Sequence, residues 1–68
     1  MARFSTDIRK EQIKGAALEI IYLDGISRFT TKRLADKIGI SEAAIFRHFS
    51  SKKEILLDIL NDVETQLL

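Results

Sequence analysis

The sequence predicts an all-α fold, a three-helix bundle followed by a fourth helix. Apolar residues recur at helical spacing in separate stretches of the 68 residues. Threonine, serine and glycine stand where those stretches begin and end. Proline and cysteine are absent and 31% of the residues are charged, which suits a short helical bundle better than a turn-rich all-β fold. A core of this size is expected to be only marginally stable alone.

The first predicted helix runs from Ile8 to Leu23. Its apolar side chains recur at offsets of three, four, seven and eight and form one stripe: Ile13, Ala16, Ala17, Ile20 and Ile21. Charged residues such as Lys10, Lys14 and Glu19 fall outside the stripe. The helix is therefore amphipathic.

Ser5, Thr6 or Asp7 can cap the start of this helix, because short polar side chains accept hydrogen bonds from its first amides. Gly25 is expected to supply the left-handed residue that commonly follows a helix end. Gly15, inside the helix, costs about 1 kcal/mol relative to alanine. We expect a neighbouring element to pack closely on its backbone.

Thr30 or Thr31 can cap a second, short helix, and Gly39 is expected to end it. The apolar residues on one face of this helix are Leu34, Ala35 and Ile38. A turn of about three residues follows, and Ser41 then caps a third helix.

The third predicted helix has one inward and one outward side. Ile45 and Phe49, four residues apart, are expected to face the core. The residues left on the outward side or at its margins are Glu42, Ala43, Phe46, Arg47 and His48. Glu42 also lies in the first turn, where the helix dipole favours negative charge.

Ser51 and Glu54 are spaced as the capping box of a fourth helix. Its apolar stripe comprises Leu56, Ile59, Leu60, Val63 and Leu67, and three further residues widen it: Ile55, Leu57 and Leu68. A stripe of this width is expected to be covered by something beyond the bundle. The sequence ends without glycine, proline or a basic last turn, so we expect the chain to stop inside or just after a helix.

Net charge is only +1, but the charges are unevenly distributed. Residues 28–53 carry seven basic and two acidic residues, a net charge of +5, whereas residues 1–27 are neutral and residues 54–68 carry four acidic residues and no basic one. A positive block of this kind fits phosphate contact, although solvated surface charge can produce the same distribution.

Two short helices joined by a glycine-containing turn describe a helix-turn-helix, whose second helix can enter the major groove of DNA. Helical pairs in many proteins that bind no DNA look similar, so this pattern alone leaves DNA binding open. A second observation favours it: Lys32 and Arg33 lie in the first turn of the second helix, and Lys52 and Lys53 in that of the fourth. The helix dipole disfavours cations there, but beside free amides they build a phosphate site. Solvated lysines are the alternative.

The outward residues of the third helix have plausible partners in a DNA groove. Arg47 could pair bidentately with guanine, Ala43 could touch a thymine methyl, and Glu42 could accept from cytosine or orient Arg47. Phe46 is either a core residue or a contact to sugar or a thymine methyl. His48 is either a phosphate or base donor or a plain surface residue.

Other classes of function find little support. Gly15, Gly25 and Gly39 form no phosphate loop, and one histidine without cysteine supplies neither a nucleophile dyad nor a metal site. We therefore expect no enzyme, no cofactor and no metal. The absence of a signal peptide or membrane span leads us to expect a cytoplasmic protein and no membrane partner. The main alternative to DNA binding is a helical protein–protein interaction module that uses the apolar, acidic fourth helix.

The stretch from Thr30 to Leu56 resembles the tetracycline-repressor (TetR) family of bacterial transcriptional regulators. The resemblance is carried by a threonine before the second helix, the Ala35-x-x-x-Gly39-Ile40-Ser41 turn, the third helix ending Phe46-Arg47-His48-Phe49, and Ser51-Lys52 before the fourth helix. Its spacing extends to the Gly25-aromatic connection after the first helix. It therefore covers nearly the whole chain.

The resemblance implies a homeodomain-like helix-turn-helix domain at residues 1–53 and, at residues 54–68, a helix that leads into a ligand-binding and dimerisation domain absent from this chain. It implies DNA contacts at Thr31, Ser41, Glu42, Ala43, Phe46, Arg47, His48 and Lys52. It further implies a homodimer on a palindromic operator, a small-molecule effector and action as a repressor. Phe46 stands where the family usually has tyrosine, which removes a hydroxyl that could bond phosphate. Ala43 replaces a frequent glycine, which limits backbone approach.

Overall fold

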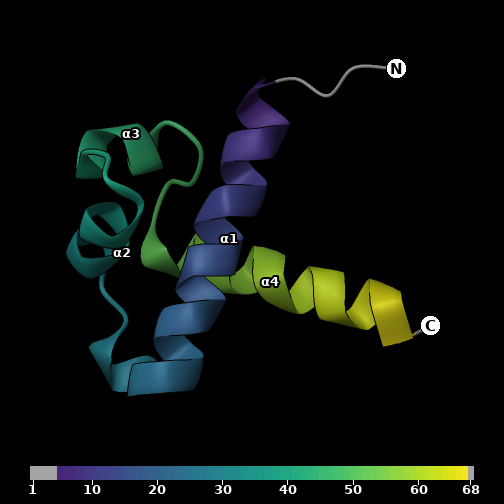
Figure 1. Cartoon of the computed structure of the whole chain (residues 1–68). Coiled ribbons are helices and arrows are strands. Elements are labelled where there is room, and N and C mark those ends of the chain that lie inside the picture. Colours follow the sequence, from purple (N-terminus) through teal and green to yellow (C-terminus); the bar gives the residue numbers. More distant parts are fainter. Residues whose placement is uncertain (1–4, 68) are drawn as a thin grey trace.

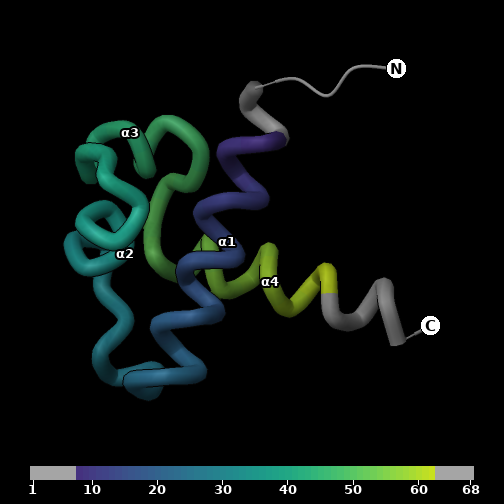
Figure 2. The backbone as a smooth tube through the Cα atoms, viewed as in Figure 1, coloured from purple at the N-terminus to yellow at the C-terminus, as the bar shows by residue number. Residues whose placement is uncertain are grey.

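The computed structural model describes the backbone of residues 5–67 and the side chains of residues 8–62. Along this part of the chain lie α1 (Ser5–Asp24), the 3-10 turn η1 (Ile26–Arg28), α2 (Thr31–Ile38), α3 (Glu42–Phe46) and α4 (Lys52–Leu67). No strand occurs between residues 5 and 67, and the all-α prediction is confirmed. The α1 helix runs through the middle of the molecule, with α2 and α3 on one side of it (Figure 1). The α4 helix crosses α1 and continues beyond it, as the backbone trace shows most simply (Figure 2).

Every helix and the connection after η1 contribute to one apolar core. The buried residues are Ile13, Ala17, Ile20, Phe29, Leu34, Ala35, Ile45, Phe49, Ile55 and Ile59. The predicted stripe of α1 is confirmed, because Ala16 and Ile21 pack against the same cluster. Phe29 is fully buried, and the helical periodicities did not predict it, since it lies between helices. Its signal was an aromatic residue in the short connection between two predicted helices.

The end of α1 differs from the prediction. Gly25 has φ 92° and ψ 156°, a conformation open essentially to glycine alone but outside the left-handed helical region expected. The chain then forms η1, closed by hydrogen bonds from the amides of Arg28 and Phe29 to the carbonyls of Gly25 and Ile26. This unpredicted turn places Phe29 in the core. The predicted capping side chains at residues 5–7 lie outside the described side chains, and the backbone of all three is already helical.

The register of α4 also differs from the prediction. Ile55 is fully buried and Ile59 is 7% exposed, whereas Leu60 is 57% exposed. Leu56 packs only at the edge of the core. Because the apolar surface of this helix is broad, the sequence pattern is compatible with burial of several different faces. Contacts with α1 decide which face is buried. Val63, Leu67 and Leu68 lie outside the described side chains.

The contacts between α1 and α4 include a buried lysine. Lys14, which the sequence pattern placed off the apolar face of α1, is only 7% exposed. Its ammonium nitrogen lies 3.3 Å from a carboxylate oxygen of Glu11 and 3.7 Å from one of Asp58, and it pairs most closely with Asp62. Asp58 and Asp62 are one turn apart on α4. A single cation thus joins two turns of α4 to α1.

Burial alone would lower the pKa of Lys14, because it removes the ammonium group from water. Hydrogen bonds to Asp62 and Glu11 and the charges of Asp58 and Asp62 outweigh that effect, and the pKa lies above the ordinary value of a lysine. Lys14 is therefore charged at neutral pH and its ion pairs are formed.

Replacing Lys14 with methionine is expected to destabilise the fold, since methionine keeps the length of the side chain but leaves the carboxylates of Asp58 and Asp62 facing each other. A buried pair broken on one side typically costs about 3–5 kcal/mol. The two aspartate side chains are 34% and 45% exposed, so water compensates part of this and we expect about 1–3 kcal/mol. Urea unfolding followed by circular dichroism measures the change. Lys53→Met, at an exposed position of α4, is the matched control.

The same pair of proteins gives a pH test. Because the pKa of Lys14 is raised in the folded state, its contribution to folding stability is complete below the pKa of the unfolded state. That contribution is lost as pH rises through the pKa of the folded state. The difference between wild type and Lys14→Met should thus stay constant from neutral pH to about pH 9 and shrink above about pH 10. A difference that is absent at neutral pH would show that Lys14 does not hold α4.

Gly15 carries no neighbour, which contradicts the expected close packing on its backbone. A methyl group added there meets nothing within 4 Å, and the residue is exposed in the interior of α1. Gly15→Ala should therefore raise the unfolding free energy by about 0.5–1 kcal/mol, through helix propensity and a smaller entropy loss on folding. Gly39→Ala serves as the contrast. Open space surrounds Gly39 too, but its φ of +87° strains any other residue, so this variant should lose stability. Thermal melting of both variants tests this explanation, which is wrong if the two melting temperatures shift in the same direction.

Candidate nucleic-acid interface

A three-residue turn joins α2 to α3. Gly39 has left-handed backbone angles, φ 87° and ψ 32°. The amides of Gly39 and Ile40 both donate to the carbonyl oxygen of Ala35, at 2.8 and 3.0 Å, an arrangement that closes a helix and favours glycine. The prediction that Gly39 ends the second helix is confirmed, and the two helices form the turn geometry of a helix-turn-helix.

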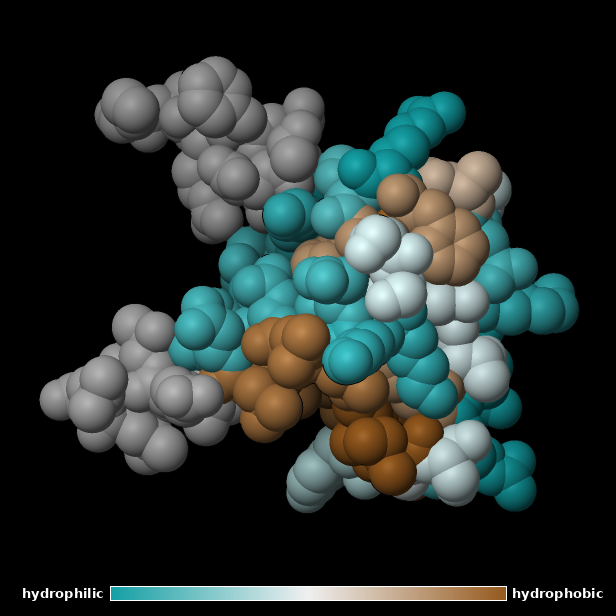
Figure 3. Space-filling view, turned by 180° about the vertical axis from the view of Figure 1, so that it is seen from behind, coloured by the Kyte–Doolittle hydropathy of each residue, from teal (hydrophilic) through white to brown (hydrophobic). Residues whose placement is uncertain are grey.

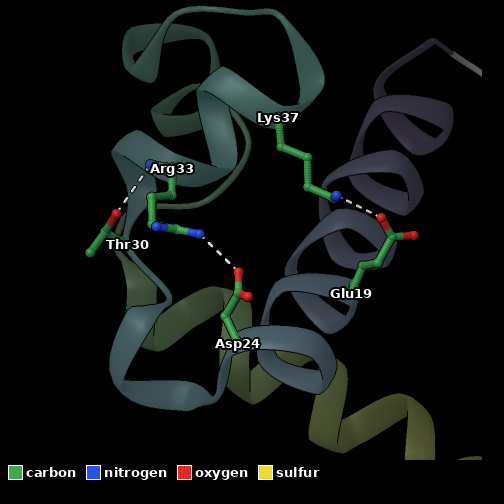
Figure 4. A network of polar contacts seen from close by, with 5 residues as sticks. All are labelled: Glu19, Asp24, Thr30, Arg33 and Lys37. Carbon is green, nitrogen blue, oxygen red and sulfur yellow. Dashed lines mark hydrogen bonds and ion pairs between the residues drawn. The ribbon is translucent and has the colours of Figure 1, made fainter.

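Each helix of the pair begins at a side-chain cap. The hydroxyl of Thr30 accepts a hydrogen bond from the amide of Arg33 at 3.1 Å (Figure 4). The hydroxyl of Ser41 accepts one from the amide of Ala44 at 3.1 Å. Of the two threonines considered for α2, Thr30 is the cap and Thr31 the first helical residue. The cap predicted at Ser41 is confirmed.

The α3 helix is shorter than the predicted segment from Glu42 to His48. It ends at Phe46, and Arg47 is its C-cap residue. The amides of Arg47 and His48 still donate to the carbonyls of Ala43 and Ile45, at 3.2 and 2.9 Å. Hydrogen bonding thus fixes the backbone through His48, so Arg47 extends from an ordered turn.

One side of α3 is buried and the other is open to solvent. Ile45 is fully buried and Phe49 is 5% exposed, which confirms both inward positions. The exposed residues of this segment are Ser41, Glu42, Ala43, Phe46 and Arg47. Phe46 is 46% exposed, so of its two alternatives the core position is wrong. The outward side therefore presents a cation, an aromatic ring, a carboxylate and one small side chain, which belong to Arg47, Phe46, Glu42 and Ala43.

Thr31 and Glu42 meet across the helix pair. The Oγ1 atom of Thr31 donates to Oε2 of Glu42 at 2.7 Å. The first turn of α2 thus contacts the first turn of α3, although the two residues are eleven positions apart in the chain. Helical periodicity within one element could not have predicted this contact.

The cations of α2 are engaged in ion pairs. The guanidinium of Arg33 lies 2.8 Å from a carboxylate oxygen of Asp24 at the end of α1, and Lys37 pairs with Glu19 of α1 at 2.6 Å. Both side chains extend from α2 toward α1 (Figure 4). Lys32 lies 3.7 Å from Asp36, and both side chains are at least 70% exposed. Arg33 is thus directed away from α3, while Lys32 remains at the surface.

The start of α4 carries two exposed lysines, Lys52 and Lys53. The hydroxyl of Ser51 accepts from the amide of Glu54 at 3.3 Å, which confirms Ser51 as a cap and is one of the two bonds of the predicted capping box. The ammonium of Lys52 lies 5.4 Å from the centroid of the Phe29 ring, within the range of a cation–π contact. Packing on Phe29 therefore orients Lys52 while its charge stays in water.

His48 is set apart from the exposed residues of α3. It is half-buried, and its Nδ1 atom is shielded from solvent without a hydrogen-bond partner. It lines an open hollow together with Lys10, Phe49, Glu54 and Asp58, among others. The ammonium of Lys10 lies 5.2 Å from the centroid of the Phe49 ring. Lys10 is thus a cation near the end of α3 that the sequence pattern did not connect with this segment.

Within residues 8–62 no group of three or more histidine, cysteine, aspartate or glutamate side chains is arranged to hold a metal ion. Of the helices described, none combines the length and apolar character needed to cross a bilayer.

Comparisons with known proteins agree with the geometry. A family model described as "Bacterial regulatory proteins, tetR family" matches residues 13–59. The nucleoid occlusion factor SlmA of Vibrio campbellii is 36% identical over 63 residues, which cover 93% of this chain and 32% of that protein. SlmA of Vibrio cholerae is 39% identical over 61 residues (88% and 31%), and SlmA of Escherichia coli O1:K1 / APEC 38% over 60 residues (88% and 30%). The chain thus spans about a third of these relatives. Comparison with solved structures returned no significant match.

Proposed function

The chain belongs to the tetR family of bacterial regulatory proteins, and from this premise we propose that it binds double-stranded DNA sequence-specifically, with α3 in the major groove. One observation carries the proposal. Ala43 and Phe46 are exposed on a capped helix and Arg47 is exposed at its C-cap, while Ile45 and, after the helix, Phe49 fix the opposite side in the core. A rigid helix with an exposed polar and aromatic side is what groove reading requires.

In this proposal the exposed side of α3 recognises bases. Arg47 pairs bidentately with guanine, and Ala43 with Phe46 contacts a thymine methyl or sugar. Glu42 accepts from cytosine. Ser41 adds its hydroxyl to the capped start of α3, and His48, beyond the end of the helix, donates to a phosphate only if its ring turns out of the hollow it lines.

Phosphate contacts come from the flanking helix starts. Lys52 and Lys53 at α4 combine ammonium groups with free amides, the arrangement that attracts anions. Lys32 is the corresponding group of α2. Arg33 contributes to the positive electrostatic potential of this surface, but its guanidinium pairs with Asp24, so its main role is to hold α2 against α1.

We further propose that this domain serves a ligand-responsive repressor. Such a protein would bind a palindromic operator as a homodimer and receive its small-molecule effector through a domain outside this chain, at the nucleoid in the cytoplasm. Apolar side chains support an additional covering domain, since they gather over α4 and toward the end of α1 (Figure 3). Leu57 and Leu60 of α4 are 49% and 57% exposed, and Leu23 of α1 is 66% exposed.

A second candidate function is the nucleoid occlusion named for the SlmA relatives. Their identity of 36–39% favours it, but it extends over only about a third of their length. A helical protein–protein interaction module remains an alternative on the same exposed α4 surface. Selection of genomic DNA fragments with the full-length protein separates the repressor from the interaction module, because a repressor selects a few operators and an interaction module selects none.

Arg47→Ala should relax or abolish sequence preference, with a loss of about 1–3 kcal/mol of discrimination, because one bidentate base contact disappears. Competition binding with a selected duplex and scrambled duplexes measures it. Arg28→Ala is the matched control, since it removes the same charge from an exposed position on η1. Unchanged preference in Arg47→Ala would remove α3 from the reading role.

Lys52→Ala should weaken binding to all duplexes alike and lower the salt slope of binding by about one unit, because one phosphate contact is lost. Lys52→Arg keeps the charge and should keep the slope. Titrations at several salt concentrations measure both, and melting curves check that loss of the contact with Phe29 has not unfolded the domain. Loss of sequence preference at constant salt slope would contradict a phosphate contact.

A further inference from the structure

The hydrogen bond between Thr31 and Glu42 has the properties of a strong one. Its donor–acceptor distance is 2.7 Å and its acceptor is a carboxylate oxygen. Bonds of this charge-assisted kind are roughly twice as strong as neutral ones. The bond begins on a half-buried residue of α2 and ends on an exposed residue of α3, so the more buried partner is the donor.

The hydroxyl of Thr31 is available to bond Glu42 because the neighbouring Thr30 caps α2. Thr30 caps α2 by accepting from the amide of Arg33, and Thr31 is already the first helical residue. A threonine hydroxyl carries a single hydrogen. While that hydrogen is directed at Glu42, Thr31 cannot donate to a phosphate, which it would have to do in order to contact the DNA backbone.

Glu42 gains a fixed position from the bond and keeps acceptor capacity. Its carboxylate has two oxygens with about four acceptor sites, and Thr31 occupies one. Without this bond, the glutamate side chain would lose conformational entropy when it binds DNA, because several of its rotatable bonds would become fixed. The phosphates would also repel it from the groove. Held in advance by Thr31, the carboxylate remains at the start of α3, on the exposed side with Ala43.

The chemistry of a carboxylate limits what it can recognise there. In the major groove cytosine presents an N4 amino donor, whereas guanine presents acceptors at N7 and O6 and thymine one at O4. Adenine presents an N6 amino donor beside the acceptor N7. A carboxylate, which only accepts, is thus repelled by guanine and thymine, and it favours cytosine over adenine because the N7 acceptor of adenine lies beside the donor.

We propose that Thr31 is a positioning residue for base recognition, whose hydroxyl holds the Glu42 carboxylate so that Glu42 accepts a hydrogen bond from the N4 amino group of cytosine. This inference rests on the proposed function of sequence-specific DNA binding. It assigns Thr31 to the protein's own glutamate in place of the phosphate contact that the family resemblance implies.

Duplex selection from a random library tests the proposal with this chain and its variants. Wild type should select cytosine at one position. Thr31→Val keeps the shape without the hydroxyl and should lower that preference about fivefold, the worth of one hydrogen bond, with the salt slope unchanged; melting curves check that the variant is folded. Thr31→Ser retains the hydroxyl and should retain the preference. Glu42→Gln should shift the preference toward adenine, which glutamine reads. In a Glu42→Ala background, Thr31→Val should change nothing further.

Three results would overturn the inference. The first is that Thr31→Val weakens binding to all duplexes equally and reduces the salt slope, as loss of a phosphate contact would. The second is that Glu42→Gln leaves cytosine selected. The third is that Thr31→Val lowers the preference equally with and without Glu42, which would exclude coupling. Failure of the proposed function differs from all of these, because wild type itself would then select no sequence.

Discussion

The α1 helix presents Ile13, Ala17 and Ile20 to the core and, beside them, the buried ammonium group of Lys14. The apolar side chains make α1 the element against which α2 and η1 pack. The ammonium group fixes α4 through two carboxylates one turn apart. Because a buried charge is tolerated only with its partners in place, this contact allows few alternative positions of α4. Apolar burial alone would leave α4 free to rotate about its axis.

The exposed helix of the proposed interface depends on this frame for its order. With five residues, α3 is far too short to be stable by itself. Its structure comes from the burial of Ile45 and Phe49, from the cap at Ser41 and from the left-handed turn at Gly39. The residues that face solvent contribute little to stability, which leaves their chemistry free to serve recognition.

Features governed by local chemistry could be predicted from the sequence. The caps at Ser41 and Ser51 and the helix end at Gly39 follow from groups within four residues of each other. Features that depend on distant partners could not. The burial of Lys14 requires Asp58 and Asp62, more than forty residues away, and the choice of Ile55 over Leu60 on α4 follows from the same contact. The open space around Gly15 and the bond from Thr31 to Glu42 are likewise tertiary.

The positive block of residues 28–53 shows why charge counted along a chain differs from charge available in space. Arg33 and Lys37 pair with carboxylates of α1, outside the block, so they hold α2 against α1. Arg47, Lys52 and Lys53 are exposed, and within residues 8–62 no carboxylate lies in ion-pair range of them. These three cations lie at the end of α3 and the start of α4. Arg33 and Lys37, which lie opposite acidic residues of α1, thus stabilise the fold, whereas Arg47, Lys52 and Lys53 leave a localised positive surface beside the helix proposed to read DNA.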